Sequence, residues 1–179
     1  MTITAMPHVL NDLLALSHVP RWVIVPRFKE QSVADHSFRV AVIYLELCFR
    51  LDRVVTITDL VWALMHDGPE SWTGDIPGPF KTADSDANVT PWWHQCKSNI
   101  PAETQSLVKL ADLIEGATWI SKWGTGHHAA HATLNLRGEA AEKAREVAEG
   151  IGYGSDVLEG VVRGLVNDIL HEIGRVPAI

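Results

Sequence analysis

The sequence predicts an all-α fold, a helical bundle in one domain that spans all 179 residues. Apolar residues recur at helical spacing, most clearly at Val157, Leu158, Val161, Val162 and Leu165. No run of alternating apolar and polar residues is long enough to require a β-sheet. Glycines and prolines separate the periodic segments, as the ends of helices require.

The chain should begin with a short helix over residues 11–16 and a loop over residues 21–30, which follows Pro20 and contains Pro26. A long helix over residues 32–51 comes next, with Ser32 as its cap. The interior of this helix is apolar on nearly every face, which predicts a central position in the bundle.

A helix over residues 58–66 should follow, capped by Thr56 or Thr58 and ended by Gly68-Pro69. Residues 71–98 are rich in proline and glycine, so we expect mostly loop there, with at most a helical turn. Three more helices are predicted over residues 101–123, 127–149 and 155–170.

Composition limits the classes of function. The hydrophobic fraction of 46% and the charged fraction of 21% are ordinary for a globular protein, and no apolar run is long enough to span a bilayer. A net charge of −7 argues against binding a nucleic acid polymer. The N-terminus does not resemble a signal peptide, and Cys48 lies in an apolar helical pattern, so reduced thiols and a cytoplasmic location are expected.

Four residues from three predicted helices suit a divalent transition metal: His36, His66, Asp67 and Asp112. His66 and Asp67 are neighbours, and both can face one ion only near a helix end, which Gly68 and Pro69 supply. Such a site leaves positions open for water and a phosphate oxygen. Each residue could instead be separately capped, paired or solvated.

Two further carboxylates could take part in catalysis. Glu70 follows His66 by four residues, so a continuing helical turn would place it on the same face, where it could exchange a proton with the attacking water. A surface glutamate is the alternative. Asp75 follows Gly74 in a tight loop, where an Asx turn is the alternative.

The chain resembles the HD-domain metal-dependent phosphohydrolases, in particular the small 5'-deoxynucleotidases and the phage dATP triphosphohydrolases. The segments that carry the resemblance are Arg21-Trp22, Gln31 to Ser37, Leu64 to Glu70, Thr73 to Lys81 and Leu107 to Asp112.

The resemblance implies that His36, His66, Asp67 and Asp112 hold the metal, which would be cobalt, manganese, zinc, nickel or iron, with magnesium as a candidate second ion. It also implies that Glu70 acts on the attacking water and that Asp75 places the sugar or assists proton transfer. The expected substrate-binding residues are Arg21, Trp22, Ile24, Gln31, Pro79, Lys81 and Lys109.

Each of these residues has an expected task. Arg21, Lys81 and Lys109 would offset phosphate charge, although Lys109 could equally be a solvated cation. Trp22 would wall in the base or be a core aromatic. By resemblance Ile24 would lie beside adenine, and the Gln31 amide could reach the base edge.

The favoured function is a dATP triphosphohydrolase that releases deoxyadenosine and triphosphate, in a phage that replaces adenine with 2-aminoadenine. The alternatives are a 5'-deoxynucleotidase that acts on monophosphates and a non-catalytic helical interaction domain. Seven tryptophans suggest a homo-oligomer, with Trp92 and Trp93 packing on a neighbouring subunit or on their own domain. We expect His127, His128 and His131 to form a solvated helix face rather than a second metal site.

Overall fold

A computed structural model describes residues 6–77, 91–152 and 154–174, and it confirms the all-α prediction. Helices α1 (Met6–Ala15), α2 (Val33–Arg50) and α3 (Ile57–Met65) form the N-terminal half, with a short 3₁₀ turn at Leu16–His18. Two short helices follow, α4 (Glu70–Thr73) and α5 (Pro91–Ser98). Three long helices complete the chain: α6 (Ala102–Trp123), α7 (Gly126–Ile151) and α8 (Ser155–Gly174).

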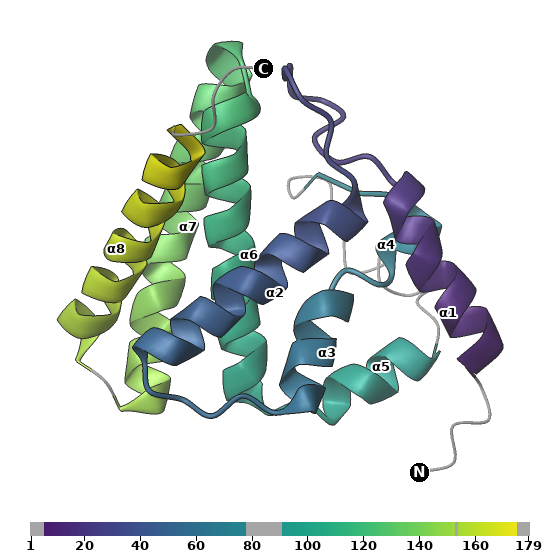
Figure 1. The fold of residues 1–179 in the computed structure, drawn as a ribbon, viewed down its shortest axis with the longest axis horizontal. Coiled ribbons are helices and arrows are strands. Elements are labelled where there is room, and N and C mark those ends of the chain that lie inside the picture. The colour runs from purple at the N-terminus through teal and green to yellow at the C-terminus, as the bar shows by residue number, and fades with distance from the viewer. Residues whose placement is uncertain (1–5, 78–90, 153, 175–179) are drawn as a thin grey trace.

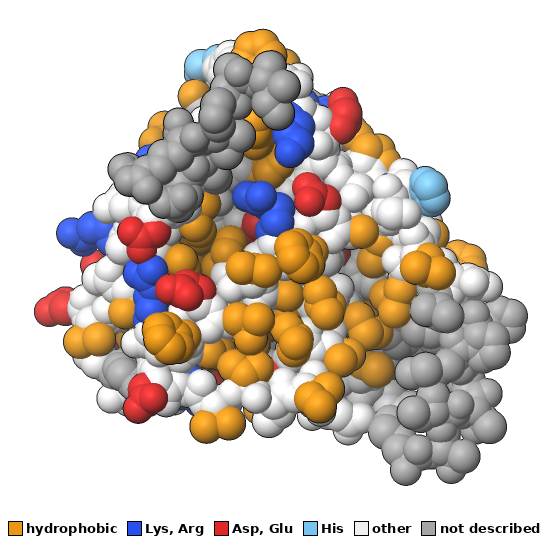
Figure 2. Space-filling model, in the orientation of Figure 1, with side chains coloured by type: hydrophobic (Ala, Val, Ile, Leu, Met, Phe, Trp, Pro, Cys, Tyr) orange, Lys and Arg blue, Asp and Glu red, His pale blue; other side chains and the backbone are white. Residues whose placement is uncertain are grey.

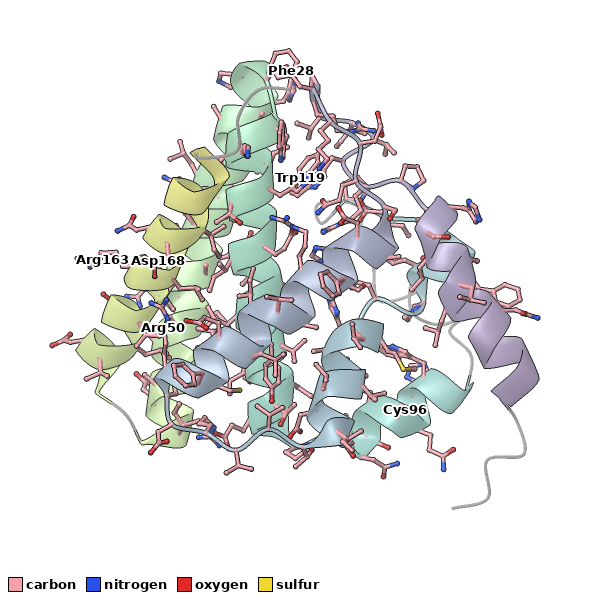
Figure 3. All side chains as sticks on the ribbon, viewed as in Figure 1. Phe28, Arg50, Cys96, Trp119, Arg163 and Asp168 are labelled. Carbon is pink, nitrogen blue, oxygen red and sulfur yellow. The ribbon has the colours of Figure 1, made fainter. Side chains whose placement is uncertain are left out.

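The helices form two groups, with α2 between them (Figure 1). On one side α6, α7 and α8 pack along one another, and on the other side lie α1, α3, α4 and α5. Helix α2 packs on both α6 and α3, and Arg50 at its C-terminal end donates to Asp168 of α8 at 2.6 Å (Figure 3). The position of α2 brings one of its faces toward both α3 and α6.

Local hydrogen bonds explain where α2 and α3 begin. The Ser32 hydroxyl accepts from the Asp35 backbone N–H at 3.1 Å, as predicted. Of the two candidate caps for α3, the structure uses Thr56, which forms a reciprocal capping box with Asp59. The Thr104 hydroxyl donates to Asp59 as well, at 2.9 Å, so this cap also ties α3 to α6.

Two predicted elements differ from the structure. Helix α1 begins at Met6, five residues before the predicted start, because Pro7 is compatible with a first helical turn. Residues 91–98 form a full helix where loop was expected, because Pro91 occupies a favourable first helical position. Trp93 is consequently buried, with its ring centroid 5.7 Å from that of Trp62, so it packs on its own domain.

Other predictions from the sequence are confirmed. Cys48 is a buried free thiol, and Cys96 is also free. The side chains of His127, His128 and His131 are exposed on α7. None of the described helices is both long enough and apolar enough to cross a membrane.

Candidate metal centre

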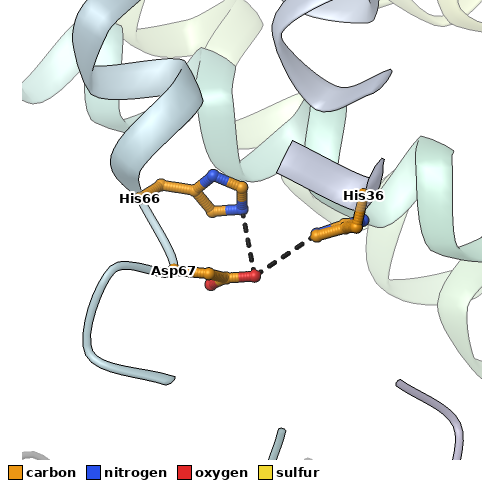
Figure 4. A group of neighbouring side chains, drawn as sticks. All are labelled: His36, His66 and Asp67. Atoms are coloured by element: carbon orange, nitrogen blue, oxygen red, sulfur yellow. Dashed lines mark ion pairs between the residues drawn. The ribbon is translucent and has the colours of Figure 1, made fainter. Parts of the chain in front are cut away.

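Three ligand groups from two helix ends meet at one point (Figure 4). His36 lies in the second turn of α2, and His66 and Asp67 lie where α3 ends. Their candidate ligand atoms all lie within 4.8 Å of one another. The Asp67 carboxylate is between the two rings, 3.3 Å from His36 Nε2 and 3.4 Å from His66 Nε2.

Asp112, from the middle of α6, joins this group through His36. Its Oδ1 atom lies 3.1 Å from His36 Nε2. The structure therefore brings all four sequence-predicted ligands together from α2, α3 and α6, although Asp112 approaches from the side of His36. The Gly68-Pro69 break after α3 lets the neighbouring residues His66 and Asp67 face the same point.

Both imidazole rings are oriented by their other nitrogen. His36 Nδ1 lies 2.7 Å from the Glu115 carboxylate, and His66 Nδ1 lies 2.9 Å from the Ala63 carbonyl. Because these are acceptors, each Nδ1 carries a proton and each Nε2 faces the cluster, where its lone pair would be available to a metal ion once the ring is neutral. Both Nε2 atoms are buried and have no hydrogen-bond partner. Unpartnered imidazole nitrogens beside a carboxylate fit a bound metal ion.

Basic neighbours keep the carboxylates of the cluster ionised despite their burial. Burial opposes ionisation of Asp67, but His66 and His36 hold its pKa well below the usual range. Burial likewise opposes ionisation of Asp112, and Lys109 and His36 lower its pKa strongly. Burial and Arg21 lower the pKa of His36, yet the carboxylates of Glu115, Asp112 and Asp67 raise it to about 10. Ionised carboxylates that stabilise a cation on His36 would also stabilise a metal cation.

Glu115 is a central residue of the site that the sequence analysis missed. It is fully buried on α6, one turn after Asp112, and it accepts from Arg39 Nε at 2.6 Å and Gln31 Nε2 at 2.9 Å as well as facing His36. Burial opposes its ionisation, but His36, Arg21 and Arg39 lower its pKa. A carboxylate in an otherwise apolar stretch of α6 was the signal available in the sequence.

A cavity of about 350 Å³ opens beside the cluster. Its lining includes three of the candidate ligands, a further carboxylate and two lysines: His66, Asp67, Asp112, Glu70, Lys97 and Lys109. Glu70, at the start of α4, is buried at this wall, as its spacing from His66 predicted. The Lys109 ammonium pairs with Asp112 at 2.7 Å, so this cation lies at the metal cluster.

Lys97 is a second cavity residue that the sequence analysis missed. It lies on α5, which was expected to be loop, and its ammonium is 5.0 Å from the centre of the Trp93 ring. The Gln105 side chain holds the end of α5 by donating to the carbonyls of Lys97 and Ile100. Folding of residues 91–98 into a helix therefore adds a positive charge to the cavity wall.

Arg21 lies deep beside the metal cluster. Its guanidinium is 3.6 Å from Glu115 and 3.9 Å from Asp75, and its side chain is 11% exposed. Its Nε and Nη1 atoms are buried without a hydrogen-bond partner. These donors can bind an anion such as a phosphate group.

Trp22 is held by its surroundings in an uncommon backbone conformation with φ of 61°. Its ring stacks on Trp119, its Nε1 donates to Gln31 at 3.0 Å, and its backbone N–H donates to Asp75 at 3.2 Å. Of the two roles predicted for Trp22, these contacts support that of a packed aromatic. Strained backbone conformations of this kind cluster at functional sites.

Among the remaining predicted site residues, Gln31 is placed differently from the expectation. Gln31 is buried and both ends of its amide are used, by Trp22 and by Glu115, so it supports these residues instead of facing a base. Asp75 anchors Trp22 and Arg21. Ile24 is 59% exposed in the loop before α2. Pro79 and Lys81 lie outside the described residues.

Comparisons with known proteins identify the family of this chain. The family model of the HD domain matches residues 14–90. The chain is 35% identical over 134 residues to a dATP triphosphohydrolase of Salmonella phage PMBT28. This match covers 66% of this chain and 69% of the relative. It is 29% identical over 146 residues to the dATP triphosphohydrolase of Acinetobacter phage SH-Ab 15497, covering 69% and 71%.

The fold is shared with a solved structure. The cyanophage S-2L HD phosphohydrolase DatZ, bound to dA and one catalytic Zn²⁺ ion, superposes with a TM-score of 0.77. The match covers 94% of this chain and 97% of that one at 22% identity.

Proposed function

We propose that this chain, which belongs to the HD-domain family of the phage dATP triphosphohydrolases, hydrolyses dATP to deoxyadenosine and triphosphate. Family membership makes the chain a metal-dependent hydrolase and removes the non-catalytic alternative. One observation carries the proposal: two unpartnered imidazole nitrogens and an ionised carboxylate converge at the wall of a cavity that also holds two lysines.

His36, His66, Asp67 and Asp112 are the residues that would hold the ion. A bound divalent ion polarises a phosphoryl oxygen and lowers the pKa of water. Zinc suits two imidazoles with carboxylates, and it is the ion named in the cyanophage structure. Glu115 and the Ala63 carbonyl would keep both rings in the tautomer that presents Nε2.

The remaining side chains divide between the proton and the phosphates. Water attacks the α-phosphorus, the bond from phosphorus to the 5'-oxygen breaks, and the 5'-oxygen leaves as the hydroxyl of deoxyadenosine. Glu70 is placed to accept the proton of the attacking water and to return it to the leaving 5'-oxygen, because its buried carboxylate forms part of the cavity wall. Arg21, Lys97 and Lys109 would offset the charge of the phosphate chain.

Three cations are more than a single phosphate requires, which favours a triphosphate over a monophosphate. The names of the phage relatives point the same way. The alternative, a 5'-deoxynucleotidase, would need only one phosphate subsite. The contact of Ile24 with adenine, the roles of Asp75, Pro79 and Lys81, and a possible second magnesium ion stay predictions from the resemblance.

The relatives are phage proteins, so we also propose that this enzyme removes dATP in the cytoplasm of an infected host. Depletion of dATP would favour 2-aminoadenine in the phage DNA. The homo-oligomer expected from the sequence remains a prediction.

Product analysis tests the proposal. The protein is loaded with zinc, cobalt or manganese and incubated with each deoxynucleoside mono- and triphosphate, and the products are separated by ion-exchange chromatography. We expect deoxyadenosine and triphosphate in equal amounts from dATP. If only the monophosphates are hydrolysed, with release of orthophosphate, the protein is a nucleotidase instead. Release of pyrophosphate from dATP would contradict cleavage of the bond between the α-phosphorus and the 5'-oxygen.

A further inference from the structure

Helix α2 exposes an apolar stripe where a surface helix normally carries charge. Phe38, Val42, Leu45 and Phe49 are 62%, 48%, 38% and 80% exposed. Asp35 is the one other exposed residue of α2. We call these four residues the α2 stripe. A helix that is apolar all round is normally buried on every side, so α2 lacks a partner on this face.

The apolar face extends onto the neighbouring helix. Ile57, Val61 and Leu64 of α3 are 83%, 44% and 39% exposed, and α3 packs directly on α2. The space-filling view shows hydrophobic side chains gathered over this part of the molecule (Figure 2). Phe38 and Phe49 alone expose on the order of 280 Å². A contiguous patch of several hundred Å² marks an interaction site.

We propose that the α2 stripe is the centre of a two-fold interface with a second copy of this chain, with the two α2 helices antiparallel. The spacings along the stripe are four, three and four residues, which read the same in both directions. Antiparallel pairing therefore places Phe38 of one copy against Phe49 of the other, and Val42 against Leu45. Such self-complementarity is what an isologous interface requires.

The charges beside the stripe fit the same pairing. Arg39 and Glu46 flank it on one side of the helix, seven residues apart, and both are partly exposed. Their midpoint lies one residue from the centre of the stripe, so antiparallel pairing brings the Arg39 of each copy toward the Glu46 of the other, next to the pairs that Arg39 makes with Glu115 and Glu46 makes with Arg50 within each copy. Opposite charges at these flanking positions set orientation in paired helices.

The exposed apolar residues supply the centre of the area that a dimer interface needs. A stable dimer covers about 800 Å² on each partner. The α2 stripe with the exposed residues of α3 provides the apolar centre of such an area, and Asp35, Arg39, Glu46 and Arg50 provide a polar rim. The inference does not depend on the proposed reaction, because the stripe faces away from His36, which is fully buried on the same helix.

Mass measurement by light scattering tests the interface. The chain has a mass of 19.7 kDa, and we expect the wild-type protein to have twice that mass or a higher even multiple. Phe38→Glu should halve the mass, whereas the control Leu134→Glu, at a residue of α7 that is 68% exposed, should leave it unchanged. A monomeric wild type, an unchanged Phe38→Glu protein or an equal effect of the control would each overturn the proposal.

Two further variants test the antiparallel orientation without relying on disruption. Phe49→Lys added to Phe38→Glu should restore the wild-type mass, because each glutamate then faces a lysine of the other copy. Val42→Cys and Leu45→Cys proteins should form a disulfide-linked dimer when mixed and oxidised, but neither should do so alone. Cross-linking of each variant alone would indicate parallel helices, and a monomer that binds phospholipid vesicles would assign the stripe to a membrane surface. Either result would overturn the proposal.

Discussion

Glu70 is the residue on which the proton-transfer part of the proposed reaction depends. Glu70→Gln keeps the shape of the side chain but removes its basicity, so turnover of dATP should fall about 10²- to 10⁴-fold. The metal content should stay the same, because Glu70 is not among the four candidate ligands. The control Glu146→Gln, on the exposed face of α7, should keep full turnover. Retained turnover, or turnover lost together with the metal, would remove Glu70 from this role.

Glu115 is expected to act through His36 as a positioning residue. Glu115→Gln weakens the acceptor that fixes the ring of His36, and the affinity for zinc should fall about 10- to 100-fold in a chelator competition. Glu139→Gln, an exposed control on α7, should not change this affinity. A purely structural role predicts a different result: a lower melting temperature in chelator, with normal zinc affinity of the folded protein.

The residue scale shows which part of the site can be predicted from sequence. The convergence of the four candidate ligands was predictable from their residue types, from the helix end after His66 and Asp67, and from the resemblance to the HD-domain family. Glu115 was not, because its importance arises from contacts with Arg39, Gln31 and His36, which are far from it in sequence. Gln31 was assigned to the base for the same reason: the sequence does not reveal that Trp22 and Glu115 already use its amide.

At the scale of elements, the cap of α3 sets the direction of the helix that ends at the metal centre. Burial alone would raise the pKa of Asp59, but hydrogen bonds from Thr56 and Thr104 lower it. Thr56→Ala should cost about 1 kcal/mol of the free energy of unfolding at neutral pH. Thr58→Ala, two residues further on and exposed, should cost much less. Equal losses in urea denaturation of the two variants would contradict the assignment of the cap.

The same cap predicts a pH dependence. Because the pKa of Asp59 is lower in the folded protein than the ordinary value of 3.8, its stabilisation is present above that value and is lost as the pH falls through the folded pKa. The difference between wild type and Thr56→Ala should therefore shrink below pH 3.8. A difference that stays constant down to the acid transition would show that Asp59 is not stabilised by this cap.

Element boundaries were predictable where residues that end or start helices agree with the periodicity: the Ser32 cap at α2, Pro101 before α6, and the glycines on either side of α7. Helix α5 was missed because the glycines and prolines of residues 74–79 led us to expect loop throughout, and this expectation concealed the short helix that Pro91 starts. Because α5 was missed, two residues of the cavity wall were missed as well: Lys97 and the buried Trp93. The apolar character of α2 was recognised, but its unpartnered face appears only in the assembled bundle.

At the scale of the whole molecule, the metal should stabilise the fold, because its ligands come from three helices that are far apart in sequence. Zinc at 100 times its dissociation constant should add about 2.7 kcal/mol to the free energy of unfolding and raise the melting temperature. Asp67→Asn should abolish this rise, and Asp156→Asn, an exposed control on α8, should keep it. A rise that persists in Asp67→Asn would place the ion elsewhere.

Anomalous diffraction from crystals of the zinc-loaded protein tests the central claim most directly, because it locates the ion without reference to activity. The account predicts one strong peak within about 2.0–2.2 Å of His36 Nε2, His66 Nε2 and the Asp67 and Asp112 carboxylates. A crystal in which these four side chains bind no ion under saturating zinc, or in which the peak lies at the exposed histidines of α7, would contradict it.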